Sequence, residues 1–306
     1  EPGHRCQSHC DDTDHHGHEG DDHGGLGIQR HDRRLTVRFW DQSPDGREVE
    51  SMAASPVTLV VPLFNESARW DDAYWEELTT IEGVSWLFVD DGSSDSTTAL
   101  VQQFTKSPNT GLLKLSRNLG KANAVRAGLR QALETGSLGV GFIDGDGAFT
   151  RVDIEKIVST FIERCGRAAQ QQTEESTWDS VWASRVALAG HQIDRKLSRH
   201  YVGRIIATII SPGLPNVPYD TQCGFKIFRS SAELTACLTE PFTTRWFFDV
   251  EVLQRWIANT GRPMKVWEVP LLHWRDVPGS KITSRNTTQI ARELATISLR
   301  NRRLAK

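Results

Sequence analysis

From residue 57 onward, short apolar runs alternate with longer segments in which apolar residues recur at helical spacing. The apolar runs predict strands buried on both faces, and the longer segments predict helices. The predicted strands are 57–61, 84–89, 112–115, 140–143 and 181–183. The predicted helices are 66–80, 94–104, 120–133 and 152–164. Repeated strand–helix units indicate an α/β fold with a mostly parallel sheet and helices on both faces.

Residues 194–210 have the pattern of an amphipathic helix, with basic side chains lying toward one side. The apolar side chains share one face: Leu197, Tyr201, Val202, Ile205, Ile206, Ile209 and Ile210. Such a face can pack on the protein core, or it can insert shallowly into a membrane surface. The pattern leaves both interpretations open.

The first 55 residues differ from the rest of the chain. They are rich in His, Asp and Gly, and they contain seven of the ten histidines. Such a composition predicts disorder, and the histidine spacing matches no structural zinc module. We therefore divide the chain into a disordered His/Asp-rich segment, 1–55, and a single α/β domain, 56–306.

Composition is typical of a globular protein, with 38% hydrophobic and 25% charged residues. No apolar run reaches the length of about 18 residues that a transmembrane helix needs, and no secretion signal is evident. The five cysteines form no dense framework, so we expect reduced thiols and a cytoplasmic location. The chain begins with Glu rather than Met, which is typical of a processed form or a fragment.

The net charge of −3 conceals an asymmetry between the two halves of the predicted domain. Residues 56–180 carry a net charge of −7, and residues 181–306 carry +10. An acidic half can hold a metal ion. A basic half can hold an anion or lie against an anionic surface. The asymmetry suits a transfer reaction on phosphates, with one half, 56–180, suited to a metal ion and the other half, 181–306, suited to an anion, and we expect no nucleic-acid partner.

The most informative local feature is the sequence Asp144-Gly145-Asp146-Gly147, directly after the predicted strand 140–143. Two carboxylates spaced in this way can share a divalent cation, and Mg²⁺ and Mn²⁺ prefer oxygen ligands. The glycines allow a tight turn and a close approach by a ligand. A polar turn that caps the next helix would show the same sequence. The other strand ends decide between the two interpretations.

Three preceding strand ends also carry polar residues suited to a nucleotide. They are Pro62-Leu63-Phe64-Asn65-Glu66, Asp90-Asp91-Gly92-Ser93, and Asn118-Leu119-Gly120-Lys121. In an open parallel sheet, ligands bind beyond the carboxyl ends of the strands. Asp91 can accept hydrogen bonds from a base or a ribose, and Lys121 can hold phosphate. Neither a Walker A sequence nor a G-x-G-x-x-G after a strand is present, which argues against a P-loop ATPase and a dinucleotide oxidoreductase.

These motifs resemble those of the family 2 inverting glycosyltransferases of GT-A fold. The resemblance is carried in the first half by VVPLFNE (60–66), VDDGSSDST (89–97), RNLGKANAVRAGL (117–129) and FIDGDGAF (142–149). In the second half, ASR (183–185), DTQCGFKIF (220–228), RWFFDVEVL (245–253) and HWRDVPGSKI (273–282) resemble the dolichyl-phosphate glucosyltransferases and dolichyl-phosphate mannose synthases, the former more closely.

The resemblance implies a role for individual residues. Pro62, Phe64, Glu66 and Asp91 match positions that bind the nucleoside, and the adjoining Asn65, Gly92, Asn118, Lys121 and Gly145 complete the predicted nucleotide-sugar site. Asp144 and Asp146 match the pair that binds Mg²⁺ or Mn²⁺. Arg275 and Lys281 match basic residues that hold the donor diphosphate and the acceptor phosphate. Arg185 joins them, and Gln222 lies near the active centre in a loop that Asp220 orders.

The chemistry of the acceptor decides whether a general base is needed. A phosphate monoester is already anionic near pH 7, because its second pKa is about 6. A hydroxyl acceptor would need a base, for which Asp220 and Asp249 are the candidates. Asp249 can equally be a polar residue at the start of a helix predicted over 248–258.

We predict a metal-dependent, inverting glycosyltransferase that moves glucose from UDP-glucose to a polyprenyl- or dolichyl-phosphate-like acceptor. The alternatives are a GDP-mannose-dependent enzyme and an enzyme with a soluble small-molecule acceptor. A more distant alternative is an inactive nucleotide- or metal-binding protein. The resembling glucosyltransferases usually carry a membrane-spanning anchor, and the expected membrane contact of this chain is peripheral.

Overall fold

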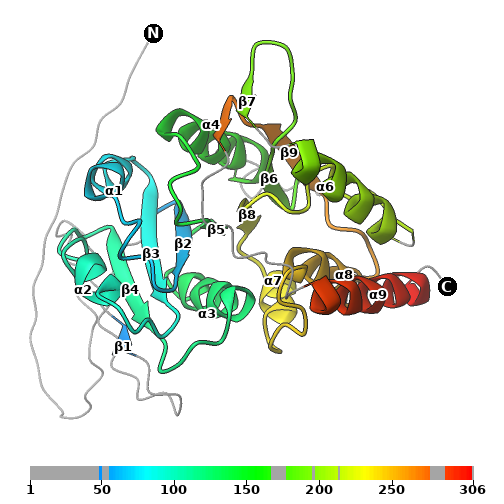
Figure 1. The fold of residues 1–306 in the computed structure, drawn as a ribbon, viewed down its shortest axis with the longest axis horizontal. Helices are drawn as coiled ribbons and strands as arrows, with labels where there is room; N and C mark the ends of the chain where they lie inside the picture. Colours follow the sequence, from blue (N-terminus) through cyan, green and yellow to red (C-terminus); the bar gives the residue numbers. More distant parts are fainter. Residues whose placement is uncertain are drawn as a thin grey trace, which may run out of the picture. The chain divides into compact units, whose positions relative to one another are not determined.

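The structure is a computed structural model, and it describes residues 48–49, 55–166, 177–194, 197–212, 214–275 and 287–304. These residues all lie within one compact unit, Leu35–Lys306. In the described parts of the chain, the largest sheet has eight strands in the order β1-β4-β3-β2-β5-β8-β6-β9 (Figure 1).

Four consecutive strands of this sheet, from β4 to β5 in sheet order, run parallel to one another. They are β2 (Val57–Leu63), β3 (Val84–Asp90), β4 (Thr110–Lys114) and β5 (Gly139–Ile143). β2 and β3 are buried along nearly their whole length, which explains their uninterrupted apolar sequences. The predicted parallel sheet is therefore confirmed for the first half of the domain.

The second half adds three strands to the same sheet. β6 (Ser180–Ser184) pairs parallel with β9 (Val266–Pro270). β8 (Phe225–Arg229) lies between β5 and β6 and runs antiparallel to both. One sheet thus spans the two predicted halves, and its single reversed inner strand joins them.

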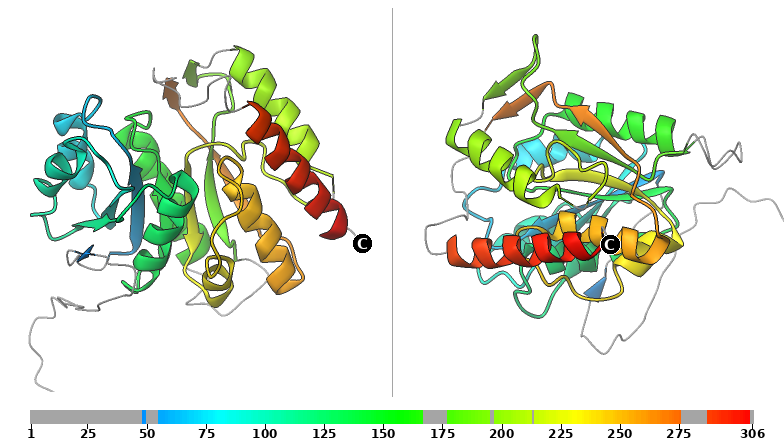
Figure 2. Two further views of the ribbon diagram at one scale, coloured as in Figure 1. Left: turned by 60° about the horizontal axis from the view of Figure 1, so that its bottom comes forward. Right: turned by 90° about the vertical axis from the view of Figure 1, so that its right-hand side faces the viewer.

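Helices cover both faces of the sheet (Figures 1 and 2). On one face, α1 (Asp72–Thr79), α2 (Thr97–Gln102) and α4 (Arg151–Phe161) bury Trp75, Val101 and Ile154 among side chains from the strands. On the other face, α3 (Lys121–Leu133), α7 (Ala232–Cys237) and α8 (Phe248–Thr260) bury a second cluster. The predicted α/β architecture is therefore confirmed.

Two further helices pack beyond α8 and form a third cluster with it. α6 (Leu197–Ile210) contributes Ile210, α9 (Thr287–Leu304) contributes Ile297, and α8 contributes Val250. Figure 2 shows α6 and α9 beside each other on this side of the domain. A small two-stranded sheet, β7 (Gln192–Asp194) with β10 (His273–Arg275), lies close to α6 in the chain and carries Arg275.

Some element boundaries differ from the prediction. α1 begins at Asp72 rather than residue 66, because Glu66–Arg69 closes a turn and the side chain of Asp71 accepts the amide of Tyr74. α2 begins at Thr97, whose amide donates to Asp95. α4 ends at Phe161 and continues as a π-helical turn, Ile162–Gly166.

The segment 1–55 was predicted to be disordered. Within it, β1 (Glu48–Val49) forms a short antiparallel pairing with β4. The residues before β1 and residues 50–54 lie outside the described part of the chain, and for them disorder stays a prediction. Within the described residues, no helix combines the length and the apolarity that a membrane span requires.

Candidate active site

The loops after β2 and β3 are tied together at the carboxyl edge of the sheet. Asn65 has a left-handed backbone (φ 52°), which asparagine tolerates better than most residues. Its side-chain oxygen accepts the amide of Ser94 at 2.9 Å, and its own amide donates to Ser93 Oγ at 3.0 Å. Glu66 is buried, and its amide donates to Thr97 Oγ1 at 2.8 Å. The two loops therefore form one fixed surface.

Asp91 connects this surface to the loop that begins α3. Its carboxylate accepts the backbone amides of Leu119 (2.7 Å) and Gly120 (2.8 Å). Burial raises the pKa of Asp91, and the two amides partly oppose that rise. Gly92 (φ 68°) lies so close that a Cβ there would be 2.6 Å from the carbonyl carbon of Arg117. The predicted nucleotide residues Asp91, Gly92 and Asn118 are thus brought together.

Asp144 lies at the end of β5 and pairs with Lys121 at the start of α3, at 2.5 Å. Burial lowers the pKa of Lys121, but the neighbouring Asp144 carboxylate more than offsets this, so the pKa lies above its usual value. On its other side, Asp144 packs against Gly224, where a Cβ would lie 2.2 Å from Asp144 Oδ2. Gly224 is therefore needed to leave room for this carboxylate.

Asp146 stands close enough to Asp144 for the two carboxylates to repel. Burial and the Asp144 charge both raise the pKa of Asp146, while the amide of Ala148 donates to it at 3.2 Å. A divalent cation would relieve this repulsion, and carboxylate oxygens are the ligands that Mg²⁺ and Mn²⁺ prefer. The two residues therefore fit the predicted metal. Among the described residues, no group of three or more His, Cys, Asp or Glu side chains could hold a metal ion, so the protein offers only a partial ligand set there.

Across from this pair, Arg185 at the end of β6 forms a two-bond ion pair with Asp220. Arg185 Nε donates to Asp220 Oδ2 at 2.7 Å, and Nη2 donates to Oδ1 at 2.8 Å. Burial lowers the pKa of Arg185, but the hydrogen bonds that Arg185 donates to the Asp220 carboxylate outweigh that effect and raise the pKa. Glu268 on β9 accepts the amides of Tyr219 (2.7 Å) and Asp220 (3.0 Å). The Asp220 carboxylate therefore orients Arg185, while Glu268 holds the backbone of the loop that carries Asp220. The predicted role of Asp220 in ordering this loop stays a prediction.

Asp249, at the start of α8, belongs to a second buried ion pair. Its Oδ2 accepts from Lys226 Nζ at 2.9 Å, and its Oδ1 accepts from Gln222 Nε2 at 3.2 Å. Lys226 is fully buried on β8, and its ammonium lies 4.7 Å from the centre of the Trp182 ring. The same ammonium donates to the carbonyl of Cys223 at 2.5 Å. Asp249 and Lys226 thus hold the loop that carries Gln222.

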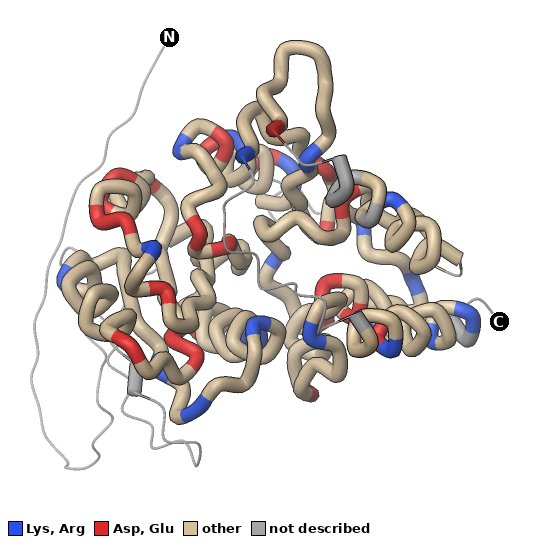
Figure 3. The backbone as a smooth tube through the Cα atoms, viewed as in Figure 1, with Lys and Arg blue, Asp and Glu red and all other residues tan. Residues whose placement is uncertain are grey.

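These groups form one electrostatic neighbourhood. The charges of Asp144, Asp146 and Asp249 all contribute to the raised pKa of Lys121. Asp144 likewise acts on Arg185, although Arg185 lies on β6 in the other half of the domain. A carboxylate of the first half therefore acts on a cation of the second half. Figure 3 shows Lys and Arg positions concentrated along α9 in the second half.

For most of the remaining predicted site residues, the structure gives a position in the fold but fewer contacts. Pro62 lies within β2, Phe64 follows its end, and Gly145 lies between the two metal-site aspartates. A Cβ at Gly145 would lie 2.7 Å from Leu63, so the turn depends on this glycine. Arg275 is exposed at the end of β10. Lys281 lies outside the described residues, and its role stays a prediction.

Comparison with known proteins identifies the family. Residues 58–232, more than half of the chain, match the family described as Glycosyl transferase family 2.

The chain belongs to glycosyl transferase family 2.

Its similar proteins include dolichyl-phosphate beta-glucosyltransferases. One from Trichomonas vaginalis is 30% identical over 253 residues, which cover 79% of this chain and 70% of that protein. One from Saccharomyces cerevisiae is 29% identical over 262 residues, which cover 79% of this chain and 74% of that protein. The prediction of a family 2 glycosyltransferase is therefore confirmed.

Solved structures support the fold. Glucosyl-3-phosphoglycerate synthase from Mycobacterium tuberculosis, in complex with UDP, has a TM-score of 0.52 at 16% identity, covering 81% of this chain and 80% of that chain. The same enzyme in complex with Mn²⁺, UDP and phosphoglyceric acid also has a TM-score of 0.52 and covers 81% of this chain and 78% of that chain. These similarities confirm the predicted GT-A fold.

The structure adds residues that the sequence analysis did not assign. They are Arg69, Gly224, Lys226, Arg245 and Glu268. Lys226 and Gly224 lie inside the motif DTQCGFKIF, where a lysine within an apolar run is a signal of a buried partner. Arg69 pairs with Glu66 and acts electrostatically on Asp146. No sequence signal separated Arg69 or Glu268 from ordinary surface charges, and Arg245 lies in the motif RWFFDVEVL, where the sequence assigned it no role.

Proposed function

We propose that this protein transfers glucose from UDP-glucose to dolichyl phosphate or a similar polyprenyl phosphate, with inversion at the anomeric carbon and with a divalent metal. The observation that carries the proposal is the arrangement of charge around the carboxyl ends of the strands. Asp144 and Asp146 follow β5, and Arg185, paired with Asp220, follows β6, with β8 between these two strands. The names of the similar proteins supply the sugar and the acceptor.

The donor is assigned to the first half. The fixed loops of Asn65, Asp91 and Asn118 provide polar groups for the nucleoside, and Lys121 lies beside Asp144 for the diphosphate. A Mg²⁺ or Mn²⁺ ion held by Asp144 and Asp146 would neutralise charge on the diphosphate as it leaves. The proposed donor residues all lie at neighbouring strand ends, as binding in an open α/β sheet requires.

The acceptor is assigned to the second half. An acceptor phosphate is already anionic near neutral pH, so cations are needed to position it more than a base is needed to activate it. Arg185 is the described cation best placed for this, with Arg275 and Lys281 proposed to join it. Asp220 and Asp249 each accept from a buried cation, Arg185 and Lys226 respectively, and we assign them positioning roles rather than base catalysis.

The test is calorimetric titration of the protein with UDP, UDP-glucose, GDP and GDP-mannose, with and without Mn²⁺. We expect metal-dependent binding of UDP and UDP-glucose, with GDP at least about tenfold weaker, since one mismatched hydrogen-bond set costs about 1–3 kcal/mol. Selective binding of GDP-mannose would move the assignment to mannosyl transfer. Binding of neither nucleotide would refute the proposal.

Peripheral contact with an anionic membrane is a second part of the proposal. Three apolar side chains at four-residue spacing lie exposed along α6: Tyr201 (64%), Ile205 (59%) and Ile209 (39%). Ile206 and Ile210 of the same helix pack on the core, so the predicted amphipathic face is divided between core and surface. Arginines on α9, which packs beside α6, provide charge that suits anionic lipid.

The Ile205→Ser/Ile209→Ser variant tests this contact. Each buried aliphatic side chain contributes about 1.5–3 kcal/mol, so we expect binding to phosphatidylserine-containing vesicles to weaken about tenfold or more. Cosedimentation measures the binding. Leu138→Ser is the matched control, because Leu138 is a comparably exposed (50%) apolar residue in the turn before β5. Equal effects of the two variants would refute membrane contact through α6.

A further inference from the structure

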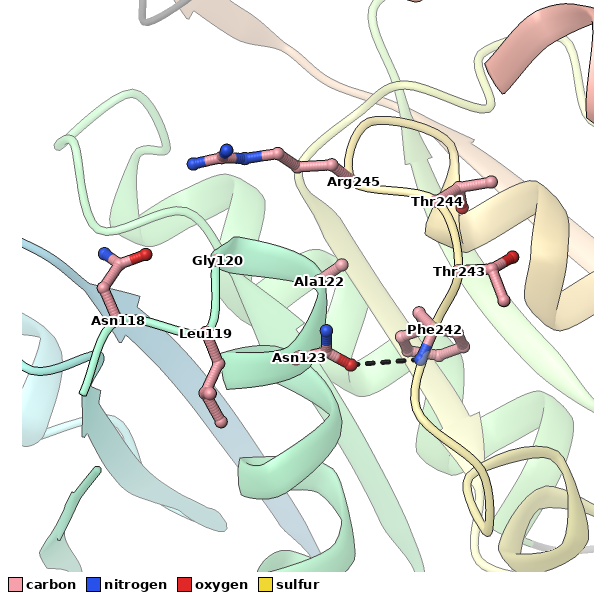
Figure 4. A pocket seen from close by; sticks show the side chains of 9 residues that line it. All are labelled: Asn118, Leu119, Gly120, Ala122, Asn123, Phe242, Thr243, Thr244 and Arg245. Carbon is pink, nitrogen blue, oxygen red and sulfur yellow. Dashed lines mark hydrogen bonds between the residues drawn. The ribbon is translucent and has the colours of Figure 1, made fainter. Parts of the chain in front are cut away.

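A cavity of about 250 Å³ lies between the start of α3 and the loop that precedes α8. Asn118, Leu119 and Gly120 line one side of it, and the loop residues 242–245 line the other. Asn123 joins the two sides, because its side-chain oxygen accepts the amide of Phe242 at 3.0 Å (Figure 4). The cavity thus borders the donor loops on one side and the second half of the domain on the other.

Arg245 extends from its loop across this cavity toward Asn118 (Figure 4). Its Nε passes 3.7 Å from the position that a Cβ at residue 120 would occupy. The Arg245 charge also acts on Asp91, where it opposes the rise in the pKa caused by burial. Arg245 therefore reaches the loops assigned to the donor, although it belongs to the other half of the chain.

The backbone of Arg245 is held from behind by α9. Glu293 Oε2 accepts the amides of Arg245 (3.0 Å) and Trp246 (2.9 Å), and Glu293 Oε1 accepts from Gln289 at 3.0 Å. Glu251 on α8 fixes the preceding residues by accepting the amides of Thr243 and Thr244. Both carboxylates are buried. The two carboxylates therefore fix the backbone of this loop by accepting its amides. Neither of them pairs with the Arg245 guanidinium.

In the described parts of the chain, no carboxylate lies within ion-pair distance of the Arg245 guanidinium. A guanidinium presents several N–H donors in a planar fork that matches phosphate oxygens. A rigid backbone, an exposed cation and an adjoining cavity together suit an anionic group of a ligand. The neighbouring Lys121 already points to Asp144, so the cavity adjoins the place assigned to the diphosphate.

We propose that Arg245 is a donor-binding residue that contacts the phosphate groups of the nucleoside diphosphate, and that Glu293 positions it. This proposal rests on the proposed function, because it takes the donor to be a nucleoside diphosphate sugar. It assigns to the second half of the domain a part in holding the donor. It also gives α9 an indirect role, since α9 supplies the carboxylate that holds the Arg245 backbone.

The test compares the binding of UDP and uridine to the wild type and to Arg245→Ala by calorimetry with Mn²⁺. Losing a charge-assisted pair costs about 1.5–3 kcal/mol, so UDP should bind about 10- to 100-fold more weakly. Uridine has no phosphate, and its affinity should stay the same. Arg130→Ala is the matched control, because Arg130 is an exposed arginine in the last turn of α3, the helix whose first turn borders the cavity.

Arg245→Lys and Glu293→Ala extend the test. The lysine variant keeps the charge but loses the fork, so we expect an intermediate loss of UDP affinity. Glu293→Ala should also weaken UDP binding, and the double variant Glu293→Ala/Arg245→Ala should bind UDP no more weakly than Arg245→Ala alone. Additive losses would refute the positioning role of Glu293, with thermal unfolding confirming that each variant is folded.

The outcomes separate the two proposals. If the wild type binds UDP and Arg245→Ala binds it equally well, the role of Arg245 is refuted and the proposed function stands. If Arg245→Ala weakens uridine and UDP alike, the contact is with the nucleoside and the assignment to phosphate is wrong. If the wild type binds neither UDP nor GDP, both proposals are refuted.

Discussion

The Asp146→Ala variant is expected to lose transfer almost completely in the presence of Mg²⁺ or Mn²⁺. Asp144 and Asp146 are close enough for one to raise the pKa of the other, and both carry oxygen ligands suited to a hard cation. A metal that stabilises a leaving diphosphate contributes several kcal/mol, so we expect turnover to fall about a thousandfold or more. Steady-state transfer assays with titrated metal measure this fall.

Two companion variants make the result specific. Asp146→Asn keeps the shape of the side chain and removes its charge, and it should be nearly as inactive as Asp146→Ala. Glu82→Ala removes an exposed acid in the turn before β3, at the other end of the sheet, and should leave turnover unchanged. Normal metal-dependent turnover in either Asp146 variant would refute the metal assignment.

Among the single substitutions proposed here, Lys226→Met is expected to lower the free energy of unfolding most. It leaves the Asp249 carboxylate buried, with Gln222 and the Val250 amide as hydrogen-bond donors but without its cation. Removing one partner of a buried ion pair costs about 3–5 kcal/mol in the free energy of unfolding. Guanidinium chloride denaturation at neutral pH measures this free energy. Lys106→Met, at an exposed lysine, should change it little.

The double variant Lys226→Met/Asp249→Leu shows whether the ion pair itself causes the loss. Replacing both members of a buried pair by apolar residues is often close to neutral. We therefore expect the double variant to be more stable than Lys226→Met alone, with an interaction energy above about 1 kcal/mol. A double variant whose loss of stability relative to the wild type equals the sum of the losses of Lys226→Met and Asp249→Leu would show that the two side chains act independently.

The sequence predicted the first half of the fold well, because its strands are buried on both faces and therefore lack polar interruptions. β2 and β3 are examples, and each occupies the predicted position with small extensions. The predicted start of α1 is too early, because the sequence of residues 66–71 is compatible with a helix turn in isolation. In the structure, Glu66 is instead engaged with Thr97 and Arg69, which no local pattern indicates.

The second half was less predictable because its strands depend on distant partners. β8 contains Lys226 in the middle of an apolar run, and its burial is explained by Asp249, which lies 23 residues later in the chain. β8 pairs antiparallel with both β5 and β6. The spacing of apolar residues along the chain does not show which strands pair or in which direction.

Site residues divide in the same way. Asp144 and Asp146 follow a strand directly, so the motif and its place at the sheet edge were evident together. Asp220 and Asp249 were recognised as important, but the sequence left open whether either is a base. Only their ion pairs with Arg185 and Lys226 favour positioning roles. Arg245 was part of a recognised motif, but its reach across the cavity depends on how the loop before α8 meets α3.

The most direct test of the account is the transfer of radiolabelled glucose from UDP-glucose to dolichyl phosphate by the purified protein with Mg²⁺ or Mn²⁺. Extraction into organic solvent separates the lipid product from the donor. We predict a metal-dependent glucosyl lipid whose glucose has the β configuration, opposite to that of the donor. If the protein binds UDP-glucose but forms no glucosyl lipid, or forms it equally well in the presence of EDTA, the central claim is contradicted.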